Sequence, residues 1–311
     1  MTSVFWFADG AGTDRTIPPV LVRWIRTQSP ALIVYGGDVY QTGSEAEFAQ
    51  FFDQLGHDVS GICEVAGNHD WESSTNKPFP ERTPIEYERF WSRFTPPQSA
   101  QPIDTTKRGG ARYDHVKDMG DWRLVFVDTG PCNKEDWPVQ DPDRSGWLRR
   151  VVTEREGRAK IVFAHHSRLS RGKHGDNDTM RALWDCLFDE TGAPRVVLTV
   201  GGHDHNVTWY EPRPRVDPHK HTVSIAQGIF VHVNGAGGHG HDETNGGFID
   251  VLKFKPITGT KPDFADDDNW CVTRIDLIGP RAADVTVLSF GNQDPPDVTA
   301  PTPLRKFEIR F

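Results

Sequence analysis

Short apolar runs alternate with longer amphipathic segments over the first two-thirds of the chain. The apolar runs are rich in Val, Ile, Leu and Phe, and they predict strands at Val4–Ala8, Ala31–Tyr35, Ile62–Ala66, Trp122–Val127, Ile161–Ala164 and Val196–Val200. Because these runs are almost continuously apolar, we expect both faces of each strand to be covered. The segments between them predict helices at Pro18–Thr27, Ser44–Leu55, Pro84–Phe94, Asp143–Glu154 and Asp176–Phe188. This alternation is typical of a layered α/β fold.

Beyond residue 207 the helical pattern stops. Short runs punctuated by Pro and Gly predict antiparallel strands at Val207–Tyr210, Thr222–Ile225, Ile229–Asn234, Phe248–Phe254, Cys271–Leu277, Val285–Phe290 and Phe307–Phe311. Without a repeat or a Ser/Gly linker, we expect one domain over residues 1–311, with a C-terminal strand extension at 246–311. The acidic stretch Ala265–Asn269 predicts a solvated loop rather than a calcium site.

Five segments share one arrangement, in which an apolar strand is followed by a turn that carries Asp, Asn or His. They are Phe7–Gly10, Gly36–Tyr40, Gly67–Asp70, Ala164–His166 and Gly202–His205. In open α/β sheets, ligands bind beyond the carboxyl ends of strands, so these polar residues are expected to converge on one crevice. Carboxylate, amide and imidazole ligands without thiolate suit borderline or hard metal ions.

The five segments differ in how specific they are. A single Gly-Asp after a strand is usually only a turn, so Asp9 alone would say little. Gly-Asn-His-Asp and Gly-His-Asp-His are far more specific, because little except a site explains such clusters after an apolar strand. Two ions held ~3.5–4 Å apart by such ligands would activate water and stabilise the oxygens of a phosphoryl displacement.

The order Asp…Gly-Asp…Gly-Asn-His-Asp…His…Gly-His-x-His resembles the calcineurin-like metallophosphoesterase superfamily, over residues 4–239. Within it, the stretches Ala66–Asp70, Gly201–Asn206 and Asn234–Gly238 are most similar to the purple (tartrate-resistant) acid phosphatase branch. The resemblance implies a four-layer α/β/β/α sandwich of two mixed sheets flanked by helices, with the C-terminal strands added. It also implies two metal ions, with Mn, Fe and Zn all suited to the ligands.

The resemblance also implies roles for individual residues. The first metal would be held by Asp9, Asp38 and His205, and the second by Asp38, Asn68, His165 and His203. His69 would contact the phosphate or protonate the leaving oxygen, Asp70 would orient His69, and His174 would be a second substrate-facing His. His166 is expected to lie behind the ligands, and His239 and His241 to lie in a loop near the site. Arg168 and Arg171 are candidates for phosphate contact or for solvent exposure.

The chain departs from the family pattern at the first metal. Most members have Asp-x-His in the first motif, but here Asp9 is followed by Gly10 and Ala11. The purple phosphatases place a Tyr three residues after the bridging Asp, where this chain has Gln41, and Tyr40 stands one residue early. We therefore do not expect the purple colour that tyrosinate-to-iron charge transfer gives. Whether Tyr40 or Asp14 replaces the missing ligand stays open.

Three functions follow from this pattern. The first is hydrolysis of a phosphomonoester by a hydroxide that bridges two metals. The second is a phosphodiesterase acting on nucleotides or cyclic nucleotides with the same residues. The third is an inactive scaffold of the same fold, motivated by the missing first-motif His and opposed by the retained ligands.

Composition narrows the partners. The 311 residues carry a net charge of −9, which argues against general nucleic-acid binding. A phosphate ester stays compatible, because bound cations reverse the local field. No apolar run reaches the ~18–20 residues that span a bilayer, and a strand predicted to begin at Ser3 leaves no room for a signal peptide, so a cytoplasmic location is expected. The four cysteines form no C-x-x-C pair and are expected to be free thiols. No partner protein is predicted.

Overall fold

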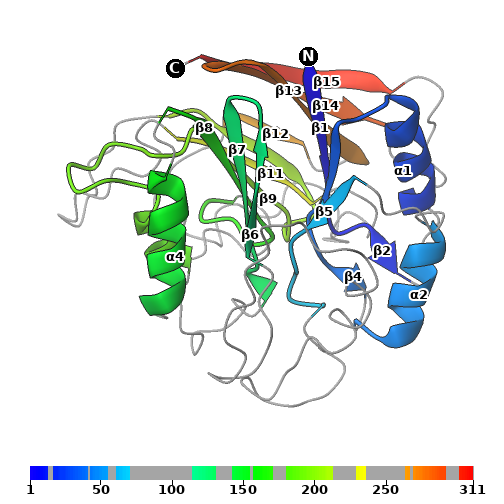
Figure 1. The fold of residues 1–311 in the computed structure, drawn as a ribbon. Coiled ribbons are helices and arrows are strands. Elements are labelled where there is room, and N and C mark those ends of the chain that lie inside the picture. The colour runs from blue at the N-terminus through cyan, green and yellow to red at the C-terminus, as the bar shows by residue number, and fades with distance from the viewer. Residues whose placement is uncertain are drawn as a thin grey trace, which may run out of the picture.

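The computed structural model describes residues 1–12, 17–40, 43–54, 61–70, 114–130, 142–154, 157–170, 180–212, 229–235, 263–266, 269–291 and 301–310. Two β-sheets pack face to face, with helices on the outer faces of both (Figure 1). Separate apolar clusters lie between the sheets and under each group of helices. The predicted α/β/β/α sandwich of two mixed sheets is therefore confirmed.

The first sheet has six strands in the order β15-β14-β13-β1-β3-β5. Their bounds are β1 Thr2–Phe7, β3 Leu32–Tyr35, β5 Ile62–Glu64, β13 Cys271–Gly279, β14 Ala282–Ser289 and β15 Thr302–Arg310. β1, β3 and β5 run parallel, and β13 joins the free edge of β1 in the antiparallel direction. The C-terminal strands, which were predicted as an addition to the fold, extend the sheet that carries the first three motifs.

The second sheet has seven strands in the order β12-β10-β11-β9-β8-β7-β6. Their bounds are β6 His115–Met119, β7 Trp122–Val127, β8 Ala159–Ala164, β9 Leu198–Gly201, β10 Val207–Tyr210, β11 Phe230–Asn234 and β12 Phe264–Asp266. β7, β8, β9 and β11 are parallel, so their carboxyl ends lie at the same edge. A two-stranded parallel pair, β2 (Ala11–Gly12) and β4 (Val39–Tyr40), lies apart from both sheets.

Four described helices flank the sheets. α1 (Ile17–Thr27) and α2 (Glu45–Gln54) cover the first sheet, and α4 (Pro142–Thr153) and α5 (Arg181–Asp185) cover the second. The Ser44–Glu47 capping box forms as predicted, because the Ser44 amide and hydroxyl both donate to Glu47 Oε2 at 2.9 Å. Among the described residues, no helix is long and apolar enough to cross a membrane.

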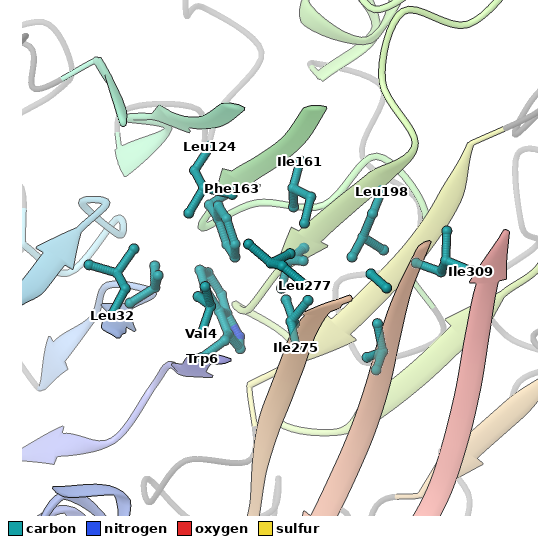
Figure 2. Close-up of a cluster of buried hydrophobic side chains, with 14 of the residues drawn as sticks. Val4, Trp6, Leu32, Leu124, Ile161, Phe163, Leu198, Ile275, Leu277 and Ile309 are labelled. Atoms are coloured by element: carbon teal, nitrogen blue, oxygen red, sulfur yellow. The ribbon is translucent and has the colours of Figure 1, made fainter. Parts of the chain in front are cut away.

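The core between the sheets is made of side chains from both of them (Figure 2). Trp6 of β1 stacks on Phe163 of β8, with ring centroids 5.7 Å apart. The Trp6 indole N–H also donates to the Asn234 carbonyl at 3.0 Å, which satisfies its buried polar atom. This packing fixes the first sheet against the second, and with it the relative positions of the strand ends.

Several elements differ from the sequence expectation. The stretch Ala265–Asn269 is not simply a solvated loop, since Phe264–Asp266 forms the edge strand β12 against β10. β6 was not predicted, and β15 is longer than the predicted Phe307–Phe311. Both are edge strands; β6 is mostly partly buried and β15 is mostly exposed, so the apolar pattern of each is weak. The predicted elements Pro84–Phe94, Thr222–Ile225 and Phe248–Phe254 lie outside the described residues.

The described cysteines bear out the expectation of free thiols. Cys63, Cys186 and Cys271 are buried and unbridged. Burial raises the pKa of the Cys63 thiol to about 12, so this group stays neutral. Cys132 lies outside the described residues.

Candidate metal centre

The predicted ligands all follow the carboxyl ends of parallel strands. Asp9 and Asp38 come after β1 and β3, Asn68 after β5, His165 directly after β8, and His203 and His205 after β9. The first three strands belong to one sheet and the last two to the other, so the ligands meet where the two sheets adjoin. All six are buried except His205, which is partly exposed. The structure therefore places polar groups from all five segments at one end of the sandwich.

The backbone at three of these ligands is in the left-handed region. The φ angles are 57° at Asp9, 65° at Asp38 and 68° at His203. Among the described non-glycine residues, only Ser29 shares this feature. Such conformations cost of order 1–3 kcal/mol each and persist where the surroundings impose them, commonly at functional sites. The left-handed backbone at these turns therefore sets the direction of the Asp9, Asp38 and His203 side chains.

Each of the two aspartates is held by one of its oxygens. Asp9 Oδ2 accepts the His203 amide at 2.9 Å, and Asp38 Oδ1 accepts the His69 amide at 2.9 Å. The second oxygens face imidazoles, with Asp9 Oδ1 3.7 Å from His205 Nε2 and Asp38 Oδ2 3.1 Å from His165 Nε2. One oxygen thus fixes each carboxylate while the other is directed into the site.

His165 is oriented as a metal ligand would be. Its Nδ1 lies 2.7 Å from the Gly36 carbonyl, which can only accept, so Nδ1 carries a proton. Nε2 is then directed at Asp38 Oδ2 and lies 3.9 Å from Asp9 Oδ1. Asp38 Oδ2, Asn68 Oδ1 and His165 Nε2 are buried and make no hydrogen bond in the structure. Orphaned buried acceptors of this kind are costly unless a cation satisfies them, so these residues fit a metal ion.

The electrostatics of the site favour positive charge. Burial opposes the ionised form of Asp38, but His165 and His69 outweigh burial and hold the pKa of Asp38 well below its usual range. Burial likewise opposes a charged His165, yet Asp38 and Asp9 raise the pKa of His165 to about 10. Without a metal, a proton on His165 would therefore balance the carboxylates. A metal ion would displace that proton on binding.

Ligand atoms converge in two overlapping groups. Asp9, Asp38 and His165 offer atoms within 4.8 Å of one another, and so do His165, His166 and His203. His166 also lies with its Nδ1 3.2 Å from Thr129 Oγ1, and its ring centroid is 4.3 Å from that of His203. The sequence placed His166 behind the ligands. In the structure one ring nitrogen of His166 lies within 4.8 Å of ring nitrogens of His165 and His203, close enough for the three to bind the same ion.

Asp70 acts on the backbone of the ligand turns. Its Oδ2 accepts the Asp38 amide at 2.9 Å and the Gly67 amide at 2.7 Å, and its Oδ1 accepts the Val39 amide at 2.8 Å. Besides the predicted orientation of His69, the Asp70 carboxylate therefore links the turn after β3 to the turn after β5 by hydrogen bonds. Burial, with the charge of Asp38, raises the pKa of Asp70 to about 6.

Tyr35 supports the same turn. The Tyr35 hydroxyl donates to the Asp38 carbonyl at 2.7 Å. Burial, followed by the charges of Asp70, Asp38 and Asp9, raises the pKa of Tyr35 well above its usual value. The phenol therefore stays protonated as a donor. In the sequence Tyr35 is only the end of a strand, and nothing in its spacing distinguishes it from a core residue.

Two glycines allow the backbone to approach the aspartates. A Cβ built on Gly67 would lie 2.6 Å from Asp38 Cγ, and one on Gly235 would lie 2.7 Å from Asp9 Oδ2. Neither position has room for a side chain beside a carboxylate. Gly235 follows β11, in the Asn234–Gly238 stretch on which the family resemblance partly rests, so the structure supplies a physical reason for glycine there.

A buried polar network fixes the end of β11. Asn234 Nδ2 donates to Thr273 Oγ1 at 2.8 Å, so the Thr273 hydroxyl proton is directed to His232 Nε2 at 2.6 Å. His232 Nδ1 lies 3.1 Å from the Thr208 carbonyl, and burial lowers the pKa of His232 to about 4. The neutral imidazole thus joins β10, β11 and β13 across the sheet interface. This network was not predicted, because its members look like ordinary strand residues in the sequence.

The remaining candidates are only partly placed. His69 lies at the site because its backbone amide donates a hydrogen bond to Asp38 Oδ1, and its side chain is partly exposed. Arg168 lines a cavity toward α5 together with Leu183 and Trp184, and it is 7% exposed, which argues against the solvated alternative. Several candidates fall outside the described residues, namely His174, Asp14, Arg171, His239 and His241, as does the side chain of Tyr40.

Comparison with known proteins identifies the family. The calcineurin-like phosphoesterase family matches residues 15–207, more than half of the chain, and the chain belongs to it. No curated protein sequence gives a match. In the part of the chain that the structure describes, two overlapping groups of carboxylate and imidazole atoms lie close enough together to hold metal ions.

Two solved structures are similar in fold. A purple acid phosphatase from yellow lupin (Lupinus luteus) seeds matches with a TM-score of 0.65 and 14% identity, over 99% of this chain and 53% of that one. This chain therefore spans about half the length of the lupin protein. GAP50, the anchor in the inner membrane complex of Plasmodium, matches with a TM-score of 0.60 and 12% identity, over 99% of this chain and 88% of that one. At these identities the likeness shows the shared fold.

Proposed function

We propose that this protein hydrolyses phosphomonoesters at a dinuclear metal centre. The observation that carries the proposal is the set of buried acceptors Asp38 Oδ2, Asn68 Oδ1 and His165 Nε2, which have no hydrogen bond and lie beside Asp9, His203 and His205. In a purely structural role a protonated His165 would pair its Nε2 with Asp38 Oδ2, 3.1 Å away, but Asn68 Oδ1 would stay unsatisfied at a cost of about 1–3 kcal/mol. Metal binding accounts for all of them at once.

In the proposal the ligands divide between two ions. Asp9 and His205 would hold the first ion, Asn68, His165 and His203 would hold the second, and Asp38 would serve both. The 3.7 Å separation of His205 Nε2 from Asp9 Oδ1 supports the first group, and the 3.1 Å separation of His165 Nε2 from Asp38 Oδ2 supports a shared ion for that pair. Bound ions would supply Lewis acidity, activating water and stabilising charge on the phosphoryl oxygens.

The chain's own residues then complete the site. Asp70 and Tyr35 hold the Asp38 turn by its amides and its carbonyl, so the shared carboxylate needs no reorganisation. His69 is tied through its amide to Asp38 Oδ1, and it donates a proton to the leaving oxygen. A monoester leaves an alkoxide or phenoxide that requires such a donor.

The test compares three substrates and two variants. Purified protein is stripped of metal and reloaded with Mn²⁺, Fe²⁺ or Zn²⁺, and turnover of p-nitrophenyl phosphate is compared with that of bis-p-nitrophenyl phosphate. We expect about two metals per chain by mass spectrometry and a preference for the monoester. With phenyl phosphate, whose poorer leaving group needs a proton, His69→Ala is expected to keep the metal and lose about 10²–10⁴-fold in turnover. Asp38→Asn is expected to lose the metal as well.

Each result has a distinct meaning. A strong preference for the diester would replace the monoesterase by a phosphodiesterase. Full turnover in His69→Ala would remove His69 from the reaction. Protein that takes up no metal and shows no turnover under any reconstitution would instead point to a non-catalytic role on this fold. The fold of the anchor GAP50 makes that last outcome a concrete alternative.

A further inference from the structure

A basic groove lies at the end of the molecule opposite the metal ligands. The end of α4, the start of β8, the segment before β9 and the turn between β13 and β14 enclose about 520 Å³. Volumes of roughly 300–1,000 Å³ are typical of small-molecule sites. β8 runs from Ala159 in the groove to Ala164 beside His165. At ~3.3 Å per residue, the backbone of Ala159 and that of His165 are roughly 20 Å apart along β8, so the groove is separate from the metal centre.

The charge of this groove opposes that of the chain. Arg158, Lys160, Arg195 and Arg281 line it, and among its described lining residues Asp189 is the only carboxylate. Four positive groups against one negative leave an excess of three, in a chain whose net charge is −9. Asp189 Oδ1 already accepts the Thr191 amide at 2.8 Å, the Thr191 hydroxyl at 2.7 Å and the Ala193 amide at 2.9 Å. The Asp189 carboxylate is therefore engaged in hydrogen bonds within the turn at residues 189–193.

Nearby carboxylates are largely balanced by other cations. Asp118 Oδ1 lies 2.9 Å from Arg123 Nε and 3.4 Å from Arg158 Nη1. Glu154 pairs with Arg123 Nη1 at 3.2 Å and with Arg150 Nε at 3.6 Å. Arg123 and Arg150 thus add two positive charges to match these two negative ones. Among the described lining residues the excess of positive charge remains.

Two of the four positive groups, and the turn that carries a third, are held in place before any ligand arrives. Lys160 is 4% exposed, and its Nζ donates to the Arg158 carbonyl at 3.0 Å. Arg195 Nη1 donates to Thr153 Oγ1 at the end of α4. The turn that carries Arg281 is fixed by a 2.7 Å bond from the Trp122 indole to the Gly279 carbonyl. Preorganised cations lose less freedom on binding an anion, which favours affinity.

We propose that this groove binds a small polyanion carrying at least two phosphate or carboxylate groups. Three arginines and one lysine line the space, and guanidinium groups bind such anions in a bidentate manner. The four residues come from segments of both sheets. A compact oligophosphate fits both the volume and the charge.

The experiment uses inorganic pyrophosphate with the full-length, metal-stripped protein, measured by calorimetry at low and moderate salt. Wild type is compared with Arg195→Gln/Arg281→Gln. The matched control is Arg23→Gln/Arg305→Gln, which removes two exposed arginines from α1 and β15. We expect single-site binding to wild type, at least 10-fold weaker binding to the groove variant, and a change under 2-fold in the control.

Two further measurements locate the site. His69→Ala is expected to bind pyrophosphate like wild type, because the groove is remote from the metal centre. If the double variant does not fold, Arg281→Gln alone, in an exposed turn, is expected to weaken binding several-fold. Equal loss in the groove and control variants, absence of binding to wild type, or loss of binding in His69→Ala would each overturn the proposal. None of these readouts depends on hydrolytic activity.

Discussion

Replacing Gly67 with Ala tests whether the position of Asp38 governs metal binding. The new Cβ would lie 2.6 Å from both Asp38 Cγ and the Asp38 amide nitrogen. Unstrained carbon contacts are about 3.5–4.0 Å, so the carboxylate or the turn has to move by about 1 Å. The turn cannot simply retreat, because the Gly67 amide donates to Asp70 Oδ2 at 2.7 Å.

The size of the effect follows from that displacement. Overpacking of this kind costs about 1–3 kcal/mol in the free energy of unfolding, less than most domains possess, so the fold should survive. A shift of about 1 Å in a catalytic group can lower turnover by about 10²-fold. Loss of a well-placed ligand geometry lowers metal affinity by about 10–100-fold. We therefore expect Gly67→Ala to remain folded, bind metal weakly and turn over slowly.

Metal titration against a competing chelator, urea unfolding and p-nitrophenyl phosphate turnover are measured together. Gly146→Ala in α4 is the control, since no neighbouring atom lies within 4 Å of its added Cβ. There the same substitution should stabilise the protein by about 0.5–1 kcal/mol, because Ala favours a helix over Gly. Wild-type metal affinity and turnover in Gly67→Ala would refute the reasoning.

Two further predictions concern buried polar groups. Burial raises the pKa of Glu64 from 4.5 to about 8, so the fold retains a proton that the unfolded chain releases, and stability falls as pH rises between these values. In chelator-treated protein, the free energy of unfolding of Glu64→Gln should rise relative to that of wild type as pH increases through this range. Urea unfolding should show a difference of up to about 5 kcal/mol at pH 8. A difference that does not change with pH would contradict this. Thr273→Val removes the hydroxyl that Asn234 Nδ2 and His232 Nε2 share, and should cost about 3 kcal/mol. Thr273→Ser, which keeps the hydroxyl, should be near wild type, so equal stability of the two variants would exclude the network.

The sequence determined the repeated unit of the site. An apolar strand followed by a polar turn is a local signal, because burial on both faces requires consecutive apolar residues. The side chains that leave such strands at their carboxyl ends share one edge. For this reason the sequence alone singles out Asp38, Asn68 and His165, and the layered fold follows from the same alternation. Edge strands such as β6 and β12 were not predicted from the sequence, because partly exposed strands carry little apolar pattern.

Only the tertiary structure decided how these residues are used. His203 and His205 are two residues apart in sequence, yet one lies against His165 and His166, and the other faces Asp9. The roles of Asp70 and of Thr273, and the basic groove at the far end of the strands, depend on contacts between segments far apart in the chain. Local periodicity reports burial and direction within one element. Hydrogen-bond partners and summed charge arise only when both sheets pack, so no pattern in a single segment encodes them.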